Sequence, residues 1–304
     1  MAEMKKGLDE LDKILDPIGD LPAGFERELA SFLPKGYISV SQATKFMHCP
    51  QAWALQYVEG RVPTTCYRMF EGRNVHRAAE VILKSKMLTG KNPPLSLATD
   101  TFSDAFEETK SSIEDWDGGE PGAMKDNGIL LTTRFHENVL PEATPVAVEE
   151  RVLTTLQLPD GKKLPLLGII DSIQVPLDRP ALEYDPEEVK KSKMPRVIHD
   201  LKVVTDKWGE NDLPNDLQFH AYAHIQGIPD VQVDQIVKGR AKVMRPRYEK
   251  ATYIVTKRDT THAVAVLGGV AKSIALGHFQ YTDPSNWWCS AKWCSMWWHC
   301  RGKK

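Results

Sequence analysis

The most distinctive hydrophobic pattern in the chain is an apolar run that encloses two charges. Residues 197–204 read Val-Ile-His-Asp-Leu-Lys-Val-Val, and this density of β-branched residues predicts a buried strand. Residues two apart on a strand share a face, so Asp200 and Lys202 point the same way. Burying an unpaired charge is costly, so each should have a partner or a metal ion. Both are candidate functional residues, with a structural ion pair as the alternative.

Two earlier strands are predicted as a hairpin. Residues 146–158 form the outgoing strand, residues 159–162 (Pro-Asp-Gly-Lys) form the turn, and residues 164–175 form the returning strand. Asp171 interrupts the second apolar strand much as Asp200 interrupts the later one. Glu150 stands early in the first strand.

Helical periodicity and capping signals surround these strands. Ser39 or Ser41 can cap a helix that runs through Phe46, and Pro50 can open the next one. A Pro- and charge-rich segment at 176–195 is expected to be a loop. The other predicted helices cover residues 8–15 (Leu8, Leu11 and Leu15), 75–88, 101–116, about 123–139, 213–226 and 260–279.

Residues 234–257 are predicted to form two strands around a basic turn. Alternation places Lys238, Arg240 and Lys242 on one face, as in a nucleic-acid-binding surface. The candidate DNA-binding residues of this segment are Lys238, Arg240, Lys242, Arg245 and Arg247.

Composition narrows the class of protein. The 304 residues are 41% hydrophobic and 26% charged, which fits one large or two modest globular domains. The formal net charge is −2, so any nucleic-acid-binding surface must be local. The sequence has no run of about 18 apolar residues, so no membrane span is predicted. The N-terminus has no hydrophobic signal core, so a cytoplasmic location is expected.

Cysteines cluster at the end of the chain. Three of the five, Cys289, Cys294 and Cys300, lie within twelve residues, and this clustering suggests metal ligation. Disulfides are not expected in a reducing cytosol.

A helix before the strands carries a further candidate. His76 and Glu80 are four residues apart and therefore share a helical face. They form either a surface pair or a metal ligand with a supporting carboxylate.

Together these groups fit metal-assisted phosphodiester hydrolysis. Hard cations such as Mg²⁺ prefer oxygen ligands, and a nearby lysine can orient water or offset phosphate charge. Asp171, Asp200 and Lys202 supply such groups from neighbouring strands, and Gln218 and Tyr222 share one face of the helix that follows.

At this point the sequence resembles the PD-(D/E)XK nuclease superfamily, in particular its RecB-like branch. The resemblance covers about residues 38–304, apart from 91–145. Four motifs occur in the family's order: Gly72-Arg73-Asn74-Val75-His76 with Glu80; Gly168-Ile169-Ile170-Asp171; Asp200-Leu201-Lys202; and Gln218-Phe219-His220-Ala221-Tyr222.

The resemblance implies a fold and roles for the site residues. The fold is α/β, a mixed central sheet flanked by helices, with a helical N-terminal part and a Cys-rich C-terminal clasp. A Mg²⁺ or Mn²⁺ ion would be held by His76, Asp171, Asp200 and the carbonyl of Leu201, with Lys202 as catalytic lysine. Gln218 and Tyr222 would support the site or contact DNA. A further carboxylate would be Glu150, with Glu149 as the alternative.

The cysteines gain a meaning from the same resemblance. Iron–sulfur-containing relatives, among them CRISPR-adaptation and phage exonucleases, place one cysteine before the nuclease core and three after it. Cys49, Cys289, Cys294 and Cys300 would therefore hold a [4Fe–4S] cluster. A zinc site, with or without His299, and plain buried thiols remain alternatives.

The expected function is a metal-dependent DNA nuclease, an exonuclease acting on single strands or duplex ends in recombination, repair or CRISPR adaptation. The alternative is a non-catalytic DNA-binding or assembly subunit with a structural zinc or iron–sulfur clasp. Oligomerisation and a recombination or replication partner stay open. The expected segments are a 1–37 arm, 38–90 helices with the first motif, a 91–145 helical insertion, the 146–258 nuclease core, and the 259–304 helix and Cys/Trp-rich clasp.

Overall fold

A computed structural model describes residues 27–177, 181–209, 211–239 and 245–302. The helix expected at 8–15 lies outside these ranges. Among the described helices, none combines the length and the apolar composition needed to cross a membrane.

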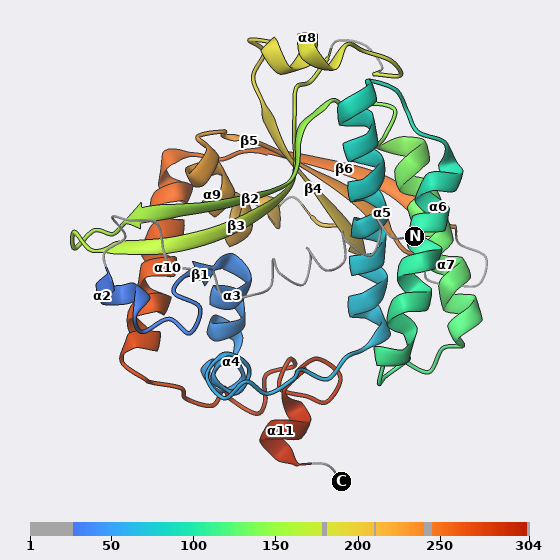
Figure 1. Cartoon of the computed structure of the whole chain (residues 1–304). Helices are drawn as coiled ribbons and strands as arrows, with labels where there is room; N and C mark the ends of the chain where they lie inside the picture. Colours follow the sequence, from blue (N-terminus) through green and yellow to red (C-terminus); the bar gives the residue numbers. More distant parts are fainter. Residues whose placement is uncertain (1–26, 178–180, 210, 240–244, 303–304) are drawn as a thin grey trace.

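A mixed sheet forms the centre of the molecule (Figure 1). Within the described residues its strand order is β1-β3-β4-β5-β6, and β2 pairs with the other edge of β3. β1 runs parallel to β3, and β4 parallel to β5, while the other pairs are antiparallel. The strands are β1 (Ile38–Ser39), β2 (Pro145–Gln157), β3 (Lys163–Gln174), β4 (Val197–Val204), β5 (Asp230–Val237) and β6 (Arg247–Ile254).

One face of the sheet is covered by helices from both ends of the chain. The apolar core there includes Trp53, Ile170, Phe219 and Leu267, all fully buried. Ser39, one of the two predicted caps, caps the helix that begins at Val40 and accepts a hydrogen bond from Gln42 N. The helices are α2 (Arg27–Ala30), α3 (Val40–His48), α4 (Pro50–Tyr57), α9 (Leu217–Gln226) and α10 (Lys257–Ala275).

Three long helices pack against one another beside the other face (Figure 1). They are α5 (Tyr67–Thr89), α6 (Leu95–Thr109) and α7 (Pro121–Asn138). Their apolar residues, such as Ile82, Phe102 and Leu131, form a second core that includes Leu201 and Ile236 of the sheet. The mixed α/β architecture with helices on both faces is therefore confirmed.

Several element boundaries differ from the sequence expectation. α5 begins eight residues before residue 75, because Tyr67 and Phe70 are themselves buried in the second core. The 176–195 segment is not all loop: α8 (Pro186–Lys191) forms there, capped by the side chain of Asp185. The helix expected at 213–226 is a 3₁₀ turn at Leu213–Asn215 followed by α9, whose N-cap is Asp216. The helix expected at 101–116 begins and ends about six residues earlier, as α6.

β3 and β4 form a fork in the middle of the sheet. The two strands pair over only three positions, the last of which joins Ser172 to His199. The next residues are Asp171 on β3 and Asp200 on β4. The same edge of β3 pairs with β1 again only at Leu166 and Leu167. The two carboxylates therefore lie where the strands separate.

The C-terminal segment of the described chain packs beside α4. The last helix, α11 (Trp297–Arg301), lies below α4 in Figure 1. The buried side chain of Met296 packs there against Ala52 and Leu55, with Cys49, Cys294 and Cys300 around it.

Candidate active site

Asp171 is held from two directions at the fork. One carboxylate oxygen accepts the backbone N–H of Leu201 at 2.9 Å and lies 3.3 Å from Nδ1 of His76. Burial by itself would raise the pKa of Asp171 and lower that of His76. The pair reverses both effects, so the pKa of Asp171 is lowered and that of His76 is raised.

Glu149 completes a group of three possible metal ligands. Ligand atoms of His76, Glu149 and Asp171 all lie within 4.8 Å of one another. Val148 pairs with Ser172 and Glu150 with Ile170, so Glu149 stands opposite Asp171 in the register. Its backbone has a φ of 52°, in the left-handed region that few non-glycine residues adopt. Strain of this kind tends to occur at functional sites.

Our first choice, Glu150, does not lie in this group. Side chains alternate along a strand, so one step in register moves a residue to the opposite face. Glu150 is opposite Ile170, whereas Glu149 is opposite Asp171 and lines the small space beside His76. Glu150 therefore lies outside this group of possible metal ligands, and the alternative, Glu149, lies within it.

Asp200 is the most deeply buried carboxylate of the site. Its side chain is 2% exposed, and its Oδ1 accepts a hydrogen bond from Gln218 Nε2 at 2.8 Å. Lys202 Nζ lies 2.7 Å from Oδ2, and no other group in the described part of the chain bonds to that oxygen. Burial, followed by the charge of Asp171, raises the pKa of Asp200 to about 7.

Lys202 is enclosed by its partners. Besides Asp200, it approaches Gln218 Oε1 at 3.4 Å and lies near the rings of Trp208 and Phe219. Burial alone would lower the pKa of Lys202, but Asp200 outweighs this effect and raises it. The lysine is therefore held as an ammonium beside the fork.

Helix α9 reaches the fork because β3 carries a glycine there. A Cβ on Gly168 would lie 3.2 Å from the ring of Tyr222 and 3.3 Å from Ile225. The missing side chain lets α9 approach closely and places Gln218 and Tyr222 over the carboxylates. Burial, together with Asp200 and Asp171, raises the pKa of Tyr222, so its hydroxyl stays protonated.

The groups at the fork fit a divalent cation. Hard cations bind carboxylate oxygens and tolerate an imidazole, and the site offers two or three carboxylates and one histidine. Oδ2 of Asp200 faces only the Lys202 ammonium among the described residues, so this carboxylate can also take part in binding a metal ion. Glu149 has its pKa raised to about 7 by burial and by Asp171, as expected where carboxylates crowd without a counter-ion.

The structure brings most of the predicted site residues together. His76, Asp171, Asp200, Leu201 and Glu149 line one small space, and Lys202, Gln218 and Tyr222 contact it from β4 and α9. Glu80 also lines that space, but its carboxylate pairs with Lys84 at 2.5 Å.

The basic turn is placed differently from the expectation. Lys238 follows the end of β5 and forms an ion pair with the buried carboxylate of Glu71 on α5. A buried glutamate needs a counter-charge, which explains why this lysine turns inward. Arg245 and Arg247 are exposed, and Arg247 pairs with Glu249 at 3.1 Å. Arg240 and Lys242 lie outside the described residues.

Four of the five cysteines surround one small cavity next to α4. Cys49, Cys289, Cys294 and Cys300 line it together with Trp288 and Trp297. Burial and the neighbouring sulfurs raise the pKa values of Cys294 and Cys300. Cys66 lies elsewhere, as the N-cap of α5.

Sequence reasoning missed one pair beside the fork. His199 Nδ1 lies 3.1 Å from Oδ2 of Asp234, a carboxylate that is 3% exposed. The signal was present, because His199 precedes Asp200 in the same strand and Asp234 is a charge in an equally apolar strand.

Comparisons with known proteins agree with this arrangement. Residues 37–301 match the family model described as the PD-(D/E)XK nuclease superfamily. No curated protein sequence matches the chain. A solved structure of a candidate exonuclease from Eubacterium rectale has a TM-score of 0.51 and 14% identity, over 94% of this chain and 95% of that one. This likeness concerns the fold alone. The structure of SSO0001, at 14% identity over 86% of this chain and 97% of that one, has a TM-score of 0.36, too low for an argument.

Proposed function

This chain belongs to the PD-(D/E)XK nuclease superfamily, and we propose that it is a divalent-metal-dependent deoxyribonuclease that degrades DNA from its ends. The observation that supports this most is the assembly at the fork of His76, Asp171, Asp200 and Lys202, which come from three separate elements.

His76, Glu149, Asp171 and Asp200 would hold Mg²⁺ or Mn²⁺, with the carbonyl of Leu201 as a further ligand. A bound ion would polarise the scissile phosphate and lower the pKa of a water molecule. The hydrogen bond from Leu201 N fixes the orientation of Asp171, so the carboxylate keeps its position without the cation.

Lys202 would act as a cation rather than as a base. Its raised pKa keeps it protonated, so it can donate hydrogen bonds to a phosphate oxygen and to the attacking water. Gln218 touches both Asp200 and Lys202, so it holds the two charges in a fixed relation.

A groove on the α3 and α9 side would lead a DNA strand to the fork. The groove has a volume of about 840 Å³ and is lined by Gln218 and Tyr222 at one point and by Lys35, Lys45 and Arg151 elsewhere. Basic side chains along such a groove neutralise phosphates whatever the base sequence. Of the basic turn, Arg245 and Arg247 would extend this contact, while Lys238 is already engaged with Glu71.

The cysteine cavity would hold a [4Fe–4S] cluster. Four thiolates are the usual ligands of such a cluster. Burial and the neighbouring sulfurs raise the pKa values of Cys294 and Cys300. These thiols therefore need a cationic group beside them to become thiolates.

Recombination, repair or CRISPR adaptation are the proposed settings, since each requires trimming of DNA ends. The competing function is a DNA-binding or assembly subunit without cleavage. The complete set of Asp171, Asp200 and Lys202 favours the enzyme, because a subunit without catalysis has no use for three clustered charges, one of them fully buried, at one fork.

The test is digestion of end-labelled linear DNA with Mg²⁺ or Mn²⁺, with free and blocked ends. We expect wild type to degrade free ends, and Asp200→Ala and Lys202→Ala to lose activity by a factor of about 100 to 10,000. Lys257→Met, an exposed lysine at the start of α10, serves as the matched control. DNA binding without cleavage under either metal would favour the assembly subunit.

A further inference from the structure

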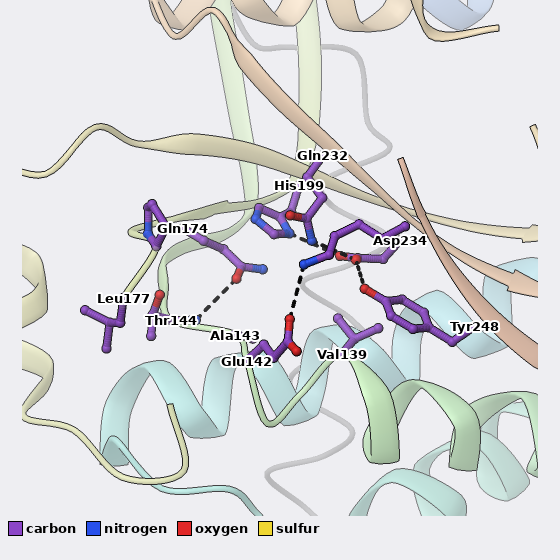
Figure 2. A pocket seen from close by; sticks show the side chains of 12 residues that line it. Val139, Glu142, Ala143, Thr144, Gln174, Leu177, His199, Gln232, Asp234 and Tyr248 are labelled. Atoms are coloured by element: carbon purple, nitrogen blue, oxygen red, sulfur yellow. Dashed lines mark hydrogen bonds and ion pairs between the residues drawn. The ribbon is translucent and has the colours of Figure 1, made fainter. Parts of the chain in front are cut away.

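A second polar cavity adjoins the fork on the side of β4, β5 and β6. It has a volume of about 330 Å³, within the size range of small-molecule sites. Figure 2 shows His199, Asp234 and Tyr248 reaching toward one another on one side, with Gln174 approaching from the other. None of these four residues belongs to the proposed metal ligands.

The floor of the cavity is a fixed hydrogen-bond network centred on Asp234. Its carboxylate receives Gln232 Nε2 at 2.8 Å, the Tyr248 hydroxyl at 2.8 Å and His199 Nδ1 at 3.1 Å. A carboxylate that accepts from one ring nitrogen fixes the tautomer and the orientation of the imidazole. His199 Nε2 is then an acceptor, and no group in the described part of the chain bonds to it.

The side-chain amides of Gln174 and Gln232 can make further hydrogen bonds on the same surface. The amide of Gln174 accepts from Thr144 N at 3.2 Å and donates to Ser172 Oγ at 3.0 Å, which uses one of its two N–H groups. The amide of Gln232 donates one hydrogen bond to Asp234 and keeps its second N–H and its carbonyl oxygen. The cavity thus presents two acceptors, His199 Nε2 and Gln232 Oε1, and two donors, one N–H each of Gln174 and Gln232, on a rigid frame.

Among the described residues that line it, the cavity has no unpaired cation, which selects the class of ligand. Lys250 pairs with Glu142 at 3.2 Å, and the negative Asp234 lies beneath His199. A phosphate group would therefore meet carboxylates without a spare cation. The remaining walls are apolar side chains: Val139, Ala143, Pro176 and Leu177. A flat, uncharged heterocycle with donors and acceptors along one edge suits this lining, and a nucleobase has that chemistry.

The cavity lies directly beside the proposed cleavage site. Its residues Gln174, His199 and Asp234 also line the small space that contains His76, Asp171 and Asp200. His199 is paired with Ser172, the last backbone pair of β3 and β4 before the fork.

We propose that this cavity holds the base of a nucleotide next to the scissile phosphate, with His199, Gln174 and Gln232 bonding its edge. The proposal rests on the nuclease function for its place in the reaction. Insertion of the base would anchor the strand end. His199 would bind the base and take no part in the chemical step.

Binding can be tested without cleavage. The probe is the fluorescent nucleoside 2-aminopurine riboside, titrated into the full-length protein without metal. We expect saturable quenching, weakened about tenfold or more in His199→Phe, which removes the acceptor, and in Leu177→Trp, which fills the cavity. Leu182→Trp is the matched control, because Leu182 is exposed on the same connection and does not line the cavity. No saturable quenching, or equal affinity in Leu177→Trp and wild type, would overturn the proposal.

Cleavage gives an independent readout. With metal, wild type should cleave an intact DNA end about tenfold or more faster, as kcat/KM, than the same end with an abasic nucleotide beside the labelled bond. In Leu177→Trp the two rates should become equal through loss on the intact substrate alone. Equal rates in wild type would contradict the base site while leaving the nuclease intact. Nucleoside binding in a protein that cleaves no DNA would contradict the nuclease and leave the binding site standing.

Discussion

Asp171 and Asp200 are the first residues beyond the last backbone pair between β3 and β4. Ser172 and His199 form that last pair, and the strands separate immediately after it. The separation leaves room for a ligand between two carboxylates that a continuous sheet would hold side by side. It also frees Leu201 N to bind Asp171 instead of a backbone carbonyl on β3.

Glu149 and Glu150 should contribute unequally to metal binding. Glu149→Gln removes a charge that lies with His76 and Asp171, so we expect Mn²⁺ affinity to fall about 10- to 100-fold. Glu150→Gln acts on the opposite face and should leave affinity within about twofold of wild type. Isothermal titration calorimetry of both variants checks this. A larger loss in Glu150→Gln would reassign the ligand.

Metal binding should strengthen as pH rises through about 7. The pKa values of Asp200 and Glu149 are raised to about 7, chiefly by burial, and both carboxyls must lose their protons to bind a cation. Below pH 7 each carboxyl should weaken Mn²⁺ affinity by up to about tenfold per pH unit. Titrations at pH 6 and pH 8 measure this, and Asp200→Asn should show a shallower dependence. An affinity that does not change with pH would show that both groups are already ionised.

In the metal-free protein, folding stability should fall as pH rises, in contrast to metal affinity. The folded state holds the Asp200 proton more tightly than the unfolded state, whose pKa stays near 3.8. The stability that this proton contributes is present at acidic pH and is lost as pH rises through about 7. Urea unfolding of metal-free wild type against Asp200→Asn at pH 5 and pH 8 isolates the effect. Equal pH dependence in the two proteins would exclude Asp200 as its source.

Substitution of any of the four cavity cysteines should remove the cluster, whereas substitution of the fifth cysteine should not. An anaerobic preparation should be brown, with absorption near 400 nm and matching iron and sulfide contents. Cys289→Ser should lose the colour and the iron, while Cys66→Ser, outside the cavity, should keep both. A colourless wild type with stoichiometric zinc would contradict the cluster.

Lys86 should make stability rise at alkaline pH. The side chain is fully buried, donates to the carbonyl of Leu140, and has its pKa lowered to about 8 by burial. In the unfolded state it keeps its proton up to about 10.5, so the unfolded state binds more protons between pH 8 and pH 10. The free energy of unfolding should rise there by up to about 1.4 kcal/mol per pH unit.

Lys86→Met removes this titration, so its stability curve should lack that rise. The measurement is urea unfolding at pH 7, 8, 9 and 10, with Lys257→Met as an exposed control. Parallel curves for wild type and Lys86→Met would show that Lys86 stays charged in the folded protein.

Much of the fold follows from local patterns. The strand predicted at 197–204 has those bounds, and Pro50 opens α4 as expected. Period-2 alternation and capping are local signals, so they can be read without knowing the rest of the chain. Predicted boundaries were wrong where packing against distant residues extended an element, as at the start of α5.

The sequence by itself determined the strands other than β1, most of the helices and the family motifs, because residue order carries them. Tertiary structure decided which groups meet. It placed Glu149 rather than Glu150 beside His76 and Asp171, through register and a left-handed backbone at one residue. It turned Lys238 toward a buried glutamate on a helix far back in the chain. It also joined His199 to Asp234 beside the fork. Each of these depends on how distant strands and helices align, and no local pattern encodes that alignment.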